Sequence, residues 1–391
     1  MRVLVAAETA PKEARVALVP AVVTRLVGQG WQVSVTAGAG RGALAADADY
    51  EQAGAEVVTD VDQALPAADI VVSVQPLPAE HAARMRPGAV SLSLLQPGSD
   101  VATVAAVAAA GASLLSFHLL PRISRAQAAD ALTSQAIVTG YRAVLVGAGL
   151  LPHFLGLSMT AAGTIRPARV LVLGAGVAGL QAMATARRLG ALVSGYDVRP
   201  ASADEVRSVG ATFIDLGLPP IEGAGGYARE MDEERATLQR ERLAEYIATH
   251  DLIITTAAVP GRRAPVLITP AMLAGVRRGT VVIDLAAESG GNVEGSAAGS
   301  IREIGPARVW GAEALASDMA PDASFLYAGN VAAMLGFISP GAAEADVASG
   351  PVPLDTSDEV IAGCAVVING EVVNPVAQEL LSASGPAGGR T

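Results

Sequence analysis

The chain has 391 residues, a formal net charge of −11 and a pI near 4.9, with 51% hydrophobic and 17% charged residues. This length suggests two or three domains with well-filled cores. The acidic balance argues against nucleic-acid or anionic-membrane binding, which needs a positive field, and the single cysteine, Cys364, excludes an internal disulfide framework.

No segment is typical of a signal peptide or a membrane span. The N-terminus carries a charge at Glu8 after only a short apolar stretch, which is too early for a signal sequence. Residues 143–164 are uncharged apart from His153, but glycines and Pro152 interrupt them, and we interpret them as a buried helix followed by a loop. We therefore expect a soluble cytoplasmic protein without direct membrane insertion.

Short apolar runs between helical segments characterise the first part of the chain. We expect a strand at residues 2–6, a helix at 21–29 and a strand at 31–36. Such runs separated by helices are typical of a parallel sheet that is covered on both faces. Further strands of the same sheet are expected at residues 70–74, 90–94 and 113–117.

A long helix at residues 124–146 is expected to connect this lobe to a second α/β lobe. The second lobe begins with a strand at 170–173, a helix at 177–189 and a strand at 192–196, which together form a βαβ unit. Two more buried strands are expected there, at residues 252–256 and 281–285.

The chain is expected to return to the first lobe beyond Trp310. Residues 330–337 have helical periodicity, and residues 364–373 predict a hairpin in which Asn369-Gly370 favours a type I′ turn. The fold class is therefore α/β, with two lobes built on parallel sheets. We place the first lobe at residues 1–132 plus 321–391 and the second at 133–320.

One segment, residues 217–234, fits neither a helix nor a strand. It contains a pair of prolines and several glycines, and it is too long for a plain connection. It is either disordered or a mobile lid. Prolines at its start and glycine hinges favour the lid in a protein that binds a nucleotide.

The strongest local signal is a glycine pattern in the second lobe. Gly174, Gly176 and Gly179 lie between a strand and a helix, and Asp197 closes the next strand. In this context the pattern is typical of dinucleotide binding. The first glycine allows a tight turn, the second allows the pyrophosphate to approach, and the third allows close packing of helix against strand. An ordinary βαβ turn is the alternative.

Asp197 is expected to accept hydrogen bonds from the adenosine ribose hydroxyls and to repel a 2′-phosphate, which favours NAD over NADP. Arg199 is close enough to weaken this argument, since it is either a cofactor contact or a solvated surface residue. We predict NAD(H) as the cofactor. The histidines show no metal-ligand spacing, so no metal site is predicted.

A second polar group, Arg122, Gln127 and Asp130, lies at the start of the connecting helix. A guanidinium, an amide and a carboxylate can bind a nicotinamide carboxamide, which has both donor and acceptor atoms. None of them is a strong general acid or base, but hydride transfer between nicotinamide rings requires alignment rather than proton abstraction. By spacing alone, polar residues that merely start a helix are the commoner explanation.

Three stretches of the chain carry a family resemblance: residues 8–20 (ETAPKEARVALVP), 120–127 (LPRISRAQ) and 327–330 (YAGN). They resemble the family shared by alanine dehydrogenase and the NAD-binding part of proton-translocating NAD(P) transhydrogenase. The resemblance runs nearly end to end. It implies two Rossmann-like lobes with NAD in the cleft between them.

The residues that hold pyruvate in alanine dehydrogenases, an arginine, a lysine and a histidine, separate the two branches of this family. Arg15 matches the arginine, but Gln75 stands at the lysine position and no histidine lies in residues 91–95. Residues 281–294, which begin with a late strand, are similar to transhydrogenase. The resemblance therefore favours transhydrogenase, because a site without the lysine and the histidine cannot polarise a keto acid.

The resemblance to transhydrogenase also implies roles for individual residues. Arg122, Gln127 and Asp130 match the loop that holds the dihydronicotinamide, with Gln127 steering ring alignment. Tyr227 lies near the tip of a mobile loop that closes over NAD. The other expected cofactor contacts are Ile123, Ser124, Thr133, Gly174, Gly176, Val177, Gly179, Asp197, Val198, Arg199, Gly226, Gln239 and Ala258.

Partners are implied as well, because the family's enzymes include a proton-conducting membrane domain and an NADP-binding domain. The chain has one dinucleotide fingerprint and no membrane span. We expect a separate NAD(H)-binding subunit that forms a homodimer on the cytoplasmic face of the inner membrane. Its partners would be the NADP-binding subunit, which holds NADP(H), and the membrane-spanning subunit. The alternatives are an alanine dehydrogenase-like amino-acid oxidoreductase and a non-catalytic NAD-binding sensor.

Overall fold

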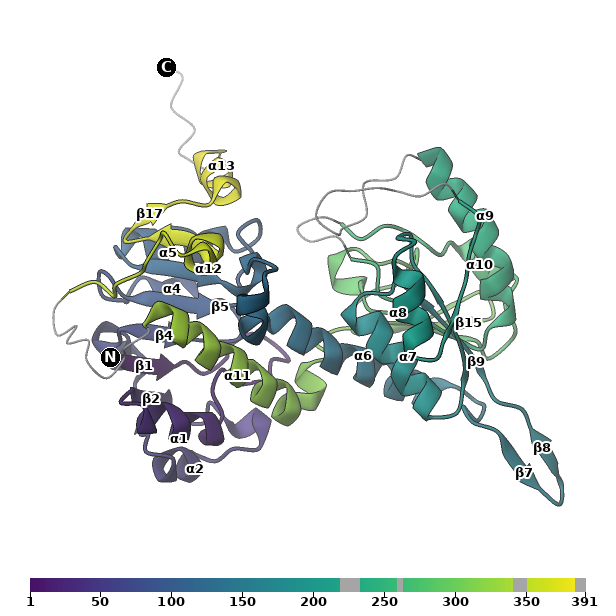
Figure 1. Ribbon diagram of the computed structural model, residues 1–391, viewed down its shortest axis with the longest axis horizontal. Helices are drawn as coiled ribbons and strands as arrows, with labels where there is room; N and C mark the ends of the chain where they lie inside the picture. Colours follow the sequence, from purple (N-terminus) through teal and green to yellow (C-terminus); the bar gives the residue numbers. More distant parts are fainter. Residues whose placement is uncertain (219–232, 259–262, 340–349, 384–391) are drawn as a thin grey trace. The chain divides into compact units, whose positions relative to one another are not determined.

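The computed structural model divides the chain into two compact units (Figure 1). Unit 1 comprises Met1–Gln135 and Ala316–Thr391, and unit 2 comprises Ala136–Leu315. These boundaries lie three and five residues from those that the sequence suggests. The residues that the structure describes are 1–218, 233–258, 263–339 and 350–383.

An eight-stranded sheet forms the centre of unit 1. In order across the sheet its strands are β17 (Glu371–Val372), β16 (Ala365–Ile368), β6 (Ser113–Ser116), β5 (Val90–Ser93), β4 (Ile70–Val72), β1 (Arg2–Val5), β2 (Gln32–Thr36) and β3 (Glu56–Val58). The six strands from β6 to β3 are parallel, whereas β16 pairs antiparallel with both of its neighbours, β6 and β17. β1 pairs with β2 on one side and β4 on the other, so the loops after β1 and β4 meet at a topological switch point, where open α/β sheets bind ligands.

Helices cover both faces of this sheet. They are α1 (Pro20–Gly28), α2 (Asp47–Gln52), α3 (Val61–Ala64), α4 (Ala79–Ala82), α5 (Val101–Ala109), α11 (Ala320–Ile338), α12 (Glu359–Cys364) and α13 (Pro375–Ala383). Because side chains alternate along a strand, β1 supplies two cores. Val3 and Val5 pack in the cluster that contains residues of α1 and α11, and Leu4 packs in the cluster that contains residues of α4 and α5.

The predicted hairpin of unit 1 is confirmed. β16 pairs with β17 across a two-residue loop, and Asn369 (φ 46°) and Gly370 (φ 87°) both have positive φ, as a type I′ turn requires. The helix predicted at residues 330–337 is part of the longer α11, which begins with proline in its first turn.

A seven-stranded sheet forms the centre of unit 2. In order its strands are β11 (Thr212–Phe213), β10 (Leu192–Tyr196), β9 (Arg169–Leu173), β12 (Leu252–Thr255), β13 (Val281–Asp284), β15 (Ala307–Gly311) and β14 (Ile301–Ile304). All are parallel except β14, and the topological switch point lies between β9 and β12. The helices of this unit include α7 (Val177–Arg188), α8 (Ser202–Ser208), α9 (Glu233–Thr249) and α10 (Pro270–Ala274). The predicted fold class of two Rossmann-like lobes is confirmed.

The prediction of one continuous helix over residues 124–146 is wrong at its start. Ser124–Ala129 form a 3₁₀-helix, η4, and the α-helix α6 runs over Ala131–Leu150. Asp130 separates the two, because its carboxylate accepts a hydrogen bond from the backbone N–H of Thr133 (2.9 Å) and caps the start of α6.

The interpretation of residues 143–164 as a buried helix and loop is also wrong in part. Beyond α6, the strands β7 (Ser158–Thr160) and β8 (Gly163–Ile165) form an antiparallel hairpin (Figure 1). Its apolar side chains are exposed, with Met159 71% and Leu157 58% accessible. Apolar side chains such as these predict burial, but no described part of the chain covers Leu157 and Met159.

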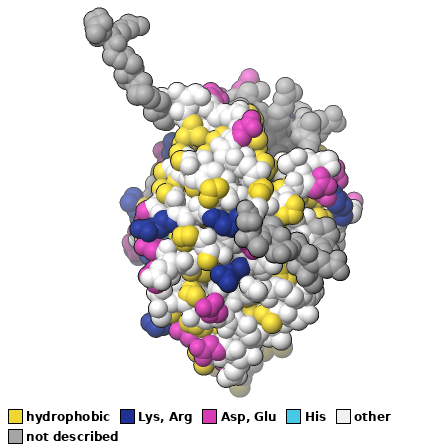
Figure 2. Space-filling model, turned by 90° about the vertical axis from the view of Figure 1, so that its left-hand side faces the viewer, with side chains coloured by type: hydrophobic (Ala, Val, Ile, Leu, Met, Phe, Trp, Pro, Cys, Tyr) yellow, Lys and Arg dark blue, Asp and Glu magenta, His cyan; other side chains and the backbone are white. Residues whose placement is uncertain are grey.

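The described helices include none with the length and apolar composition of a bilayer-spanning segment. On the face drawn in Figure 2, the described Lys and Arg side chains (dark blue) and Asp and Glu side chains (magenta) are interspersed rather than gathered into one patch. Most of the segment at 217–234, with its proposed lid, lies outside the described residues.

Candidate functional site

The glycine loop of unit 2 has the geometry that a dinucleotide fingerprint requires. Gly174 follows β9 with φ +109°, and a Cβ there would overlap Thr256 Oγ1. A Cβ on Gly179 would overlap the Gly174 carbonyl, so only glycine allows helix and loop to pack this closely. Gly176, by contrast, has an ordinary φ of −76° and open space around its Cβ position. The space beside Gly176 is therefore available to a ligand.

The N-terminus of α7 points toward this open space as an anion-binding element. Gly176 is the N-cap of α7, and no side chain in the described part of the chain caps the helix. The N–H groups of its first turn, which begins at Val177, have no partner within the helix and carry partial positive charge. Val177 is 38% exposed. This arrangement suits a pyrophosphate.

Sequence reasoning missed two residues that support the loop. Thr256, after β12, donates a hydrogen bond from its hydroxyl to the Gly174 carbonyl (3.1 Å). Gly140 lies in the middle of α6, and a Cβ there would overlap the carbonyl of Ala178 in α7. A glycine inside a predicted helix was the available signal for this close approach.

Asp197 binds the glycine loop from the end of β10. Its Oδ2 accepts a hydrogen bond from the N–H of Ala175 (2.7 Å), and its Oδ1 accepts from the N–H (2.9 Å) and Nε (3.0 Å) of Arg199. The hydrogen bond to Asp197 raises the pKa of Arg199. The charge of Arg199 is paired with Asp197, and the side chain stays partly exposed, so it remains a candidate for a cofactor contact. Val198, between them, is partly buried against the core.

Gln239 of α9 is a buried amide without a hydrogen-bond partner among the described residues. Only 1% of the residue is exposed, and neither Oε1 nor Nε2 makes a hydrogen bond within the described part of the chain. A buried amide without partners is costly, by roughly 1–3 kcal/mol, so such groups in native proteins are usually satisfied by water or a ligand. Among the predicted contacts, Gln239 therefore fits a cofactor that completes its hydrogen bonding.

A buried carboxylate fixes the segment that contains Ala258. Asp284, at the end of β13, accepts hydrogen bonds from the N–H groups of Asn292 and Val293 (both 3.1 Å). Asn292 in turn exchanges two hydrogen bonds with the backbone of Ala257 (3.0 and 2.8 Å). Ala258 is exposed beside this anchor. Gly226 and Tyr227, also predicted contacts, lie outside the described residues.

The loop of residues 122–130 belongs to unit 1. Arg122, Ser124 and Gln127 are exposed, and Ile123 packs partly against the core. Asp130 is engaged with Thr133, because Oδ1 accepts from its N–H and Oδ2 from its hydroxyl (2.7 Å). The helix-start role that spacing suggested for Arg122, Gln127 and Asp130 is thus present for Asp130. The side chain of Gln127 is exposed and therefore available to a ligand.

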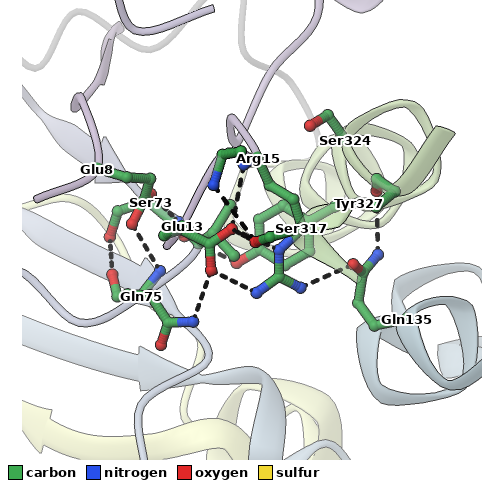
Figure 3. A network of polar contacts seen from close by, with 12 residues as sticks. Glu8, Glu13, Arg15, Ser73, Gln75, Gln135, Ser317, Ser324 and Tyr327 are labelled. Atoms are coloured by element: carbon green, nitrogen blue, oxygen red, sulfur yellow. Dashed lines mark hydrogen bonds and ion pairs between the residues drawn. The ribbon is translucent and has the colours of Figure 1, made fainter. Parts of the chain in front are cut away.

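A second set of polar groups lies at the topological switch point of unit 1 (Figure 3). Glu13 accepts hydrogen bonds from Nε (2.7 Å) and Nη2 (2.6 Å) of Arg15 and from Nε2 of Gln75 (2.8 Å). Ser317, at the start of the return segment, also donates its hydroxyl to Glu13. Both Arg15 and Gln75 are thus bonded to an internal carboxylate.

Glu8 completes this cluster from the loop after β1. Its carboxylate accepts hydrogen bonds from the backbone N–H groups of Val74 (2.6 Å) and Gln75 (3.1 Å), which follow β4. Tyr327 of α11 donates its hydroxyl to the neighbouring Ser73 carbonyl (2.8 Å) and is fully buried. The two loops of the switch point are therefore joined to each other.

The two carboxyls of the cluster have opposite pKa shifts. Burial raises the pKa of Glu8 to about 7, although its backbone hydrogen bonds oppose the shift. Burial also acts to raise the pKa of Glu13, but hydrogen bonding and charge attraction to Arg15 outweigh it and lower that pKa to about 2. At neutral pH, Glu13 and Arg15 form an ion pair, and Glu8 is close to its midpoint of ionisation.

Two family descriptions match the chain almost end to end. Residues 4–139 match "Alanine dehydrogenase/PNT, N-terminal domain", and residues 143–375 match "Alanine dehydrogenase/PNT, C-terminal domain". The chain belongs to this family. The predicted resemblance is confirmed.

Within the family, the chain is more similar to transhydrogenase subunits than to alanine dehydrogenase. The first part of NAD(P) transhydrogenase subunit alpha of Rhodospirillum rubrum is 42% identical over 96% of this chain and 98% of that protein. A solved transhydrogenase structure from Sinorhizobium meliloti has a TM-score of 0.81 and 40% identity, covering 96% of this chain and 99% of that one. Alanine dehydrogenase of Mycobacterium tuberculosis is 32% identical over 76% of this chain and 75% of that protein.

Proposed function

We propose that the chain is the NAD(H)-binding subunit of a proton-translocating NAD(P) transhydrogenase. The observation that carries the proposal is the 42% identity, across nearly the whole chain, with a protein named as the first part of NAD(P) transhydrogenase subunit alpha. In this proposal the cofactor supplies the hydride, which passes from NADH to NADP⁺ on a partner subunit. A separate membrane-spanning subunit couples the transfer to proton movement.

The residues of unit 2 would bind the adenosine and pyrophosphate parts of NAD(H). The N-terminus of α7 and the open space at Gly176 suit the pyrophosphate, and Asp197 suits the ribose hydroxyls. The orphaned amide of Gln239 would gain partners from the adenosine half. Val177, Val198, Arg199 and Ala258 would complete these contacts, together with Gly226 and a closing loop tipped by Tyr227.

The loop of residues 122–130 would orient the nicotinamide. Arg122, Gln127 and Asp130 provide a cation, an amide and a carboxylate for the carboxamide, and Gln127 would set the ring's approach to NADP. Ile123, Ser124 and Thr133 would line the same part of the site. Because transfer of a hydride between two nicotinamides moves no proton, alignment is the whole task of these residues.

Replacement of Asp197 tests the assignment of the ribose site. We expect Asp197→Ser to weaken NADH binding about tenfold or more, because a charge-assisted hydrogen bond is worth about 1.5–3 kcal/mol. NADPH binding should improve, since Arg199 is released from Asp197 and can meet a 2′-phosphate. Fluorescence titration with both nucleotides measures the change.

Asp204→Ser is the matched control for this experiment, because it removes an exposed carboxylate that pairs with Arg207 on α8. Equal losses of NADH affinity in both variants would mean that Asp197 contributes only general negative charge or stability.

We also propose that the chain forms a homodimer through the β7–β8 hairpin. Leu157, Met159 and Ile165 are 58%, 71% and 42% exposed, and a second copy of the chain would cover them. Met159→Asp should shift the protein toward monomer in sedimentation analysis, because a charge would be buried in the interface. Val376→Asp, at a 50% exposed valine of α13, should leave the mass unchanged. An unaltered dimer in Met159→Asp would place the interface elsewhere.

The alanine dehydrogenase-like alternative is less well supported. Gln75 replaces the lysine, and both Gln75 and Arg15 are bonded to Glu13 rather than directed to an open site. A non-catalytic NAD-binding sensor would share the glycine loop but would not support hydride exchange with any partner. Association with partner subunits would keep the chain on the cytoplasmic face of the inner membrane.

A further inference from the structure

A chain of buried hydrogen bonds runs from the cluster at the switch point of unit 1 to the loop of residues 122–130. Arg15 donates from Nη1 to Oε1 of Gln135 (2.8 Å), and Gln135 donates from Nε2 to the hydroxyl oxygen of Ser134 (3.2 Å). Ser134 donates to Oδ1 of Asn330 (2.6 Å), and Asn330 donates from Nδ2 to the carbonyl of Ala128 (2.9 Å). Each of the four side chains is at most 9% exposed.

Groups that can only donate or only accept set the direction of the bonds in this chain. A guanidinium only donates, so the carbonyl end of the Gln135 amide faces it, and the NH₂ end donates to Ser134 and to the Ala323 carbonyl (3.0 Å). The Ser134 hydroxyl, which accepts from Gln135, then donates to the carbonyl end of Asn330. The NH₂ end of Asn330 is left to hold the Ala128 carbonyl, next to Gln127 in the loop.

We propose that Gln135 and Asn330 are positioning residues for hydride transfer, and that the Glu13–Arg15 pair anchors them. The place where related folds bind a ligand is here filled by Glu13, Arg15 and Gln75 (Figure 3). The hydrogen bonds through Gln135, Ser134 and Asn330 connect this cluster to the backbone of η4, which carries Gln127. This inference rests on the proposed function, because it concerns the rate of that reaction.

Asn330→Asp is the direct test, since it keeps the acceptor for Ser134 and removes the donor to Ala128. With the NADP-binding subunit present, we expect the maximum rate of hydride exchange to fall about tenfold or more, because small displacements of an aligned group have large effects on rate. The KM for NADH should change less than about threefold, because the adenosine contacts are untouched. Gln135→Glu, which keeps the acceptor for Arg15 and loses the donor to Ser134 and to the Ala323 carbonyl, should act in the same direction.

Ser324→Ala is the matched control. Like Asn330, Ser324 is a buried polar residue of α11, but its hydroxyl accepts from the N–H of Val16 (2.9 Å) and takes no part in the hydrogen bonds between Arg15 and Ala128. We expect its exchange rate to stay within about twofold of wild type, even if the melting temperature falls. A wild-type rate in Asn330→Asp, or an equal loss of rate in Ser324→Ala, overturns the inference. If Asn330→Asp does not fold, Gln135→Glu decides in the same way. Absence of exchange in the wild-type mixture would instead contradict the proposed function, and the inference with it.

Discussion

Gly176→Val is expected to abolish most NADH affinity while leaving the fold intact. The position has a φ of −76°, which any residue adopts, and no atom of the described residues lies within 4 Å of its Cβ position. A valine there would project into the space beside the N-terminus of α7, where we place the pyrophosphate. We expect about a 100-fold loss of affinity, equivalent to about 2.8 kcal/mol, in a fluorescence titration with NADH.

The control for this variant is Gly149→Val in α6, where a Cβ also meets nothing within 4 Å. Both variants should melt within a few degrees of wild type. Wild-type NADH affinity in Gly176→Val would mean that the phosphates do not approach this loop. A parallel loss of affinity and melting temperature would mean that the open space is needed by the fold rather than by a ligand.

Glu8→Gln is expected to change how the stability of unit 1 depends on pH. The pKa of Glu8 is about 7 in the folded protein and 4.5 ordinarily. Between these two values the folded state retains a proton that the unfolded state has lost, so the unfolding free energy falls as pH rises. The decline should total about 3 kcal/mol and be complete above pH 7. Glutamine at this position has no ionisable group, so Glu8→Gln should lack this decline in unfolding free energy.

Glu13 provides the opposite slope at lower pH. Its pKa of about 2 lies below the ordinary value, so its stabilisation is present above pH 4.5 and is lost as the pH falls toward 2. The cluster as a whole should therefore favour the folded state most near pH 4.5. This part of the profile should be the same in wild type and Glu8→Gln.

The measurement is urea unfolding at pH 5 and pH 8 in a Trp310→Phe background, so that Trp31, buried in unit 1, is the reporter. The stability of Glu8→Gln relative to wild type should increase by about 2.5 kcal/mol between the two pH values. Glu51→Gln, an exposed site on α2, controls for the loss of one acidic side chain. Parallel profiles in Glu8→Gln and wild type would show that Glu8 does not carry a proton at neutral pH.

The parts of the fold that could be predicted from sequence are those with local causes. Buried strands such as β9 and β12 are short apolar runs, and the glycine loop combines a turn, a helix start and a spacing to Asp197 within about one βαβ unit. The type I′ turn at Asn369-Gly370 was predictable because only a few residue types tolerate its backbone angles.

The supporting contacts were not predictable, because they join residues that are far apart in the chain. Arg15 and Gln135 are separated by 120 residues, and Ser134 and Asn330 by 196. The resemblance matches Arg15 to an arginine and Gln75 to a lysine of alanine dehydrogenases, but no sequence pattern shows that both are bonded to Glu13. The hairpin of β7 and β8 was misinterpreted for another reason, since its apolar residues indicate burial without saying which surface covers them.

Hydride exchange from NADPH to an NAD analogue is the most direct test of the central claim. It should be measured with the purified chain alone and with the NADP-binding subunit from the same source. Exchange only in the mixture is the predicted result, because we propose that this chain binds NAD(H) and that the partner subunit holds the second nucleotide, with which it must align. No exchange in the mixture despite demonstrated NADH binding, or turnover of NADH with pyruvate and ammonia by the chain alone, would contradict the account.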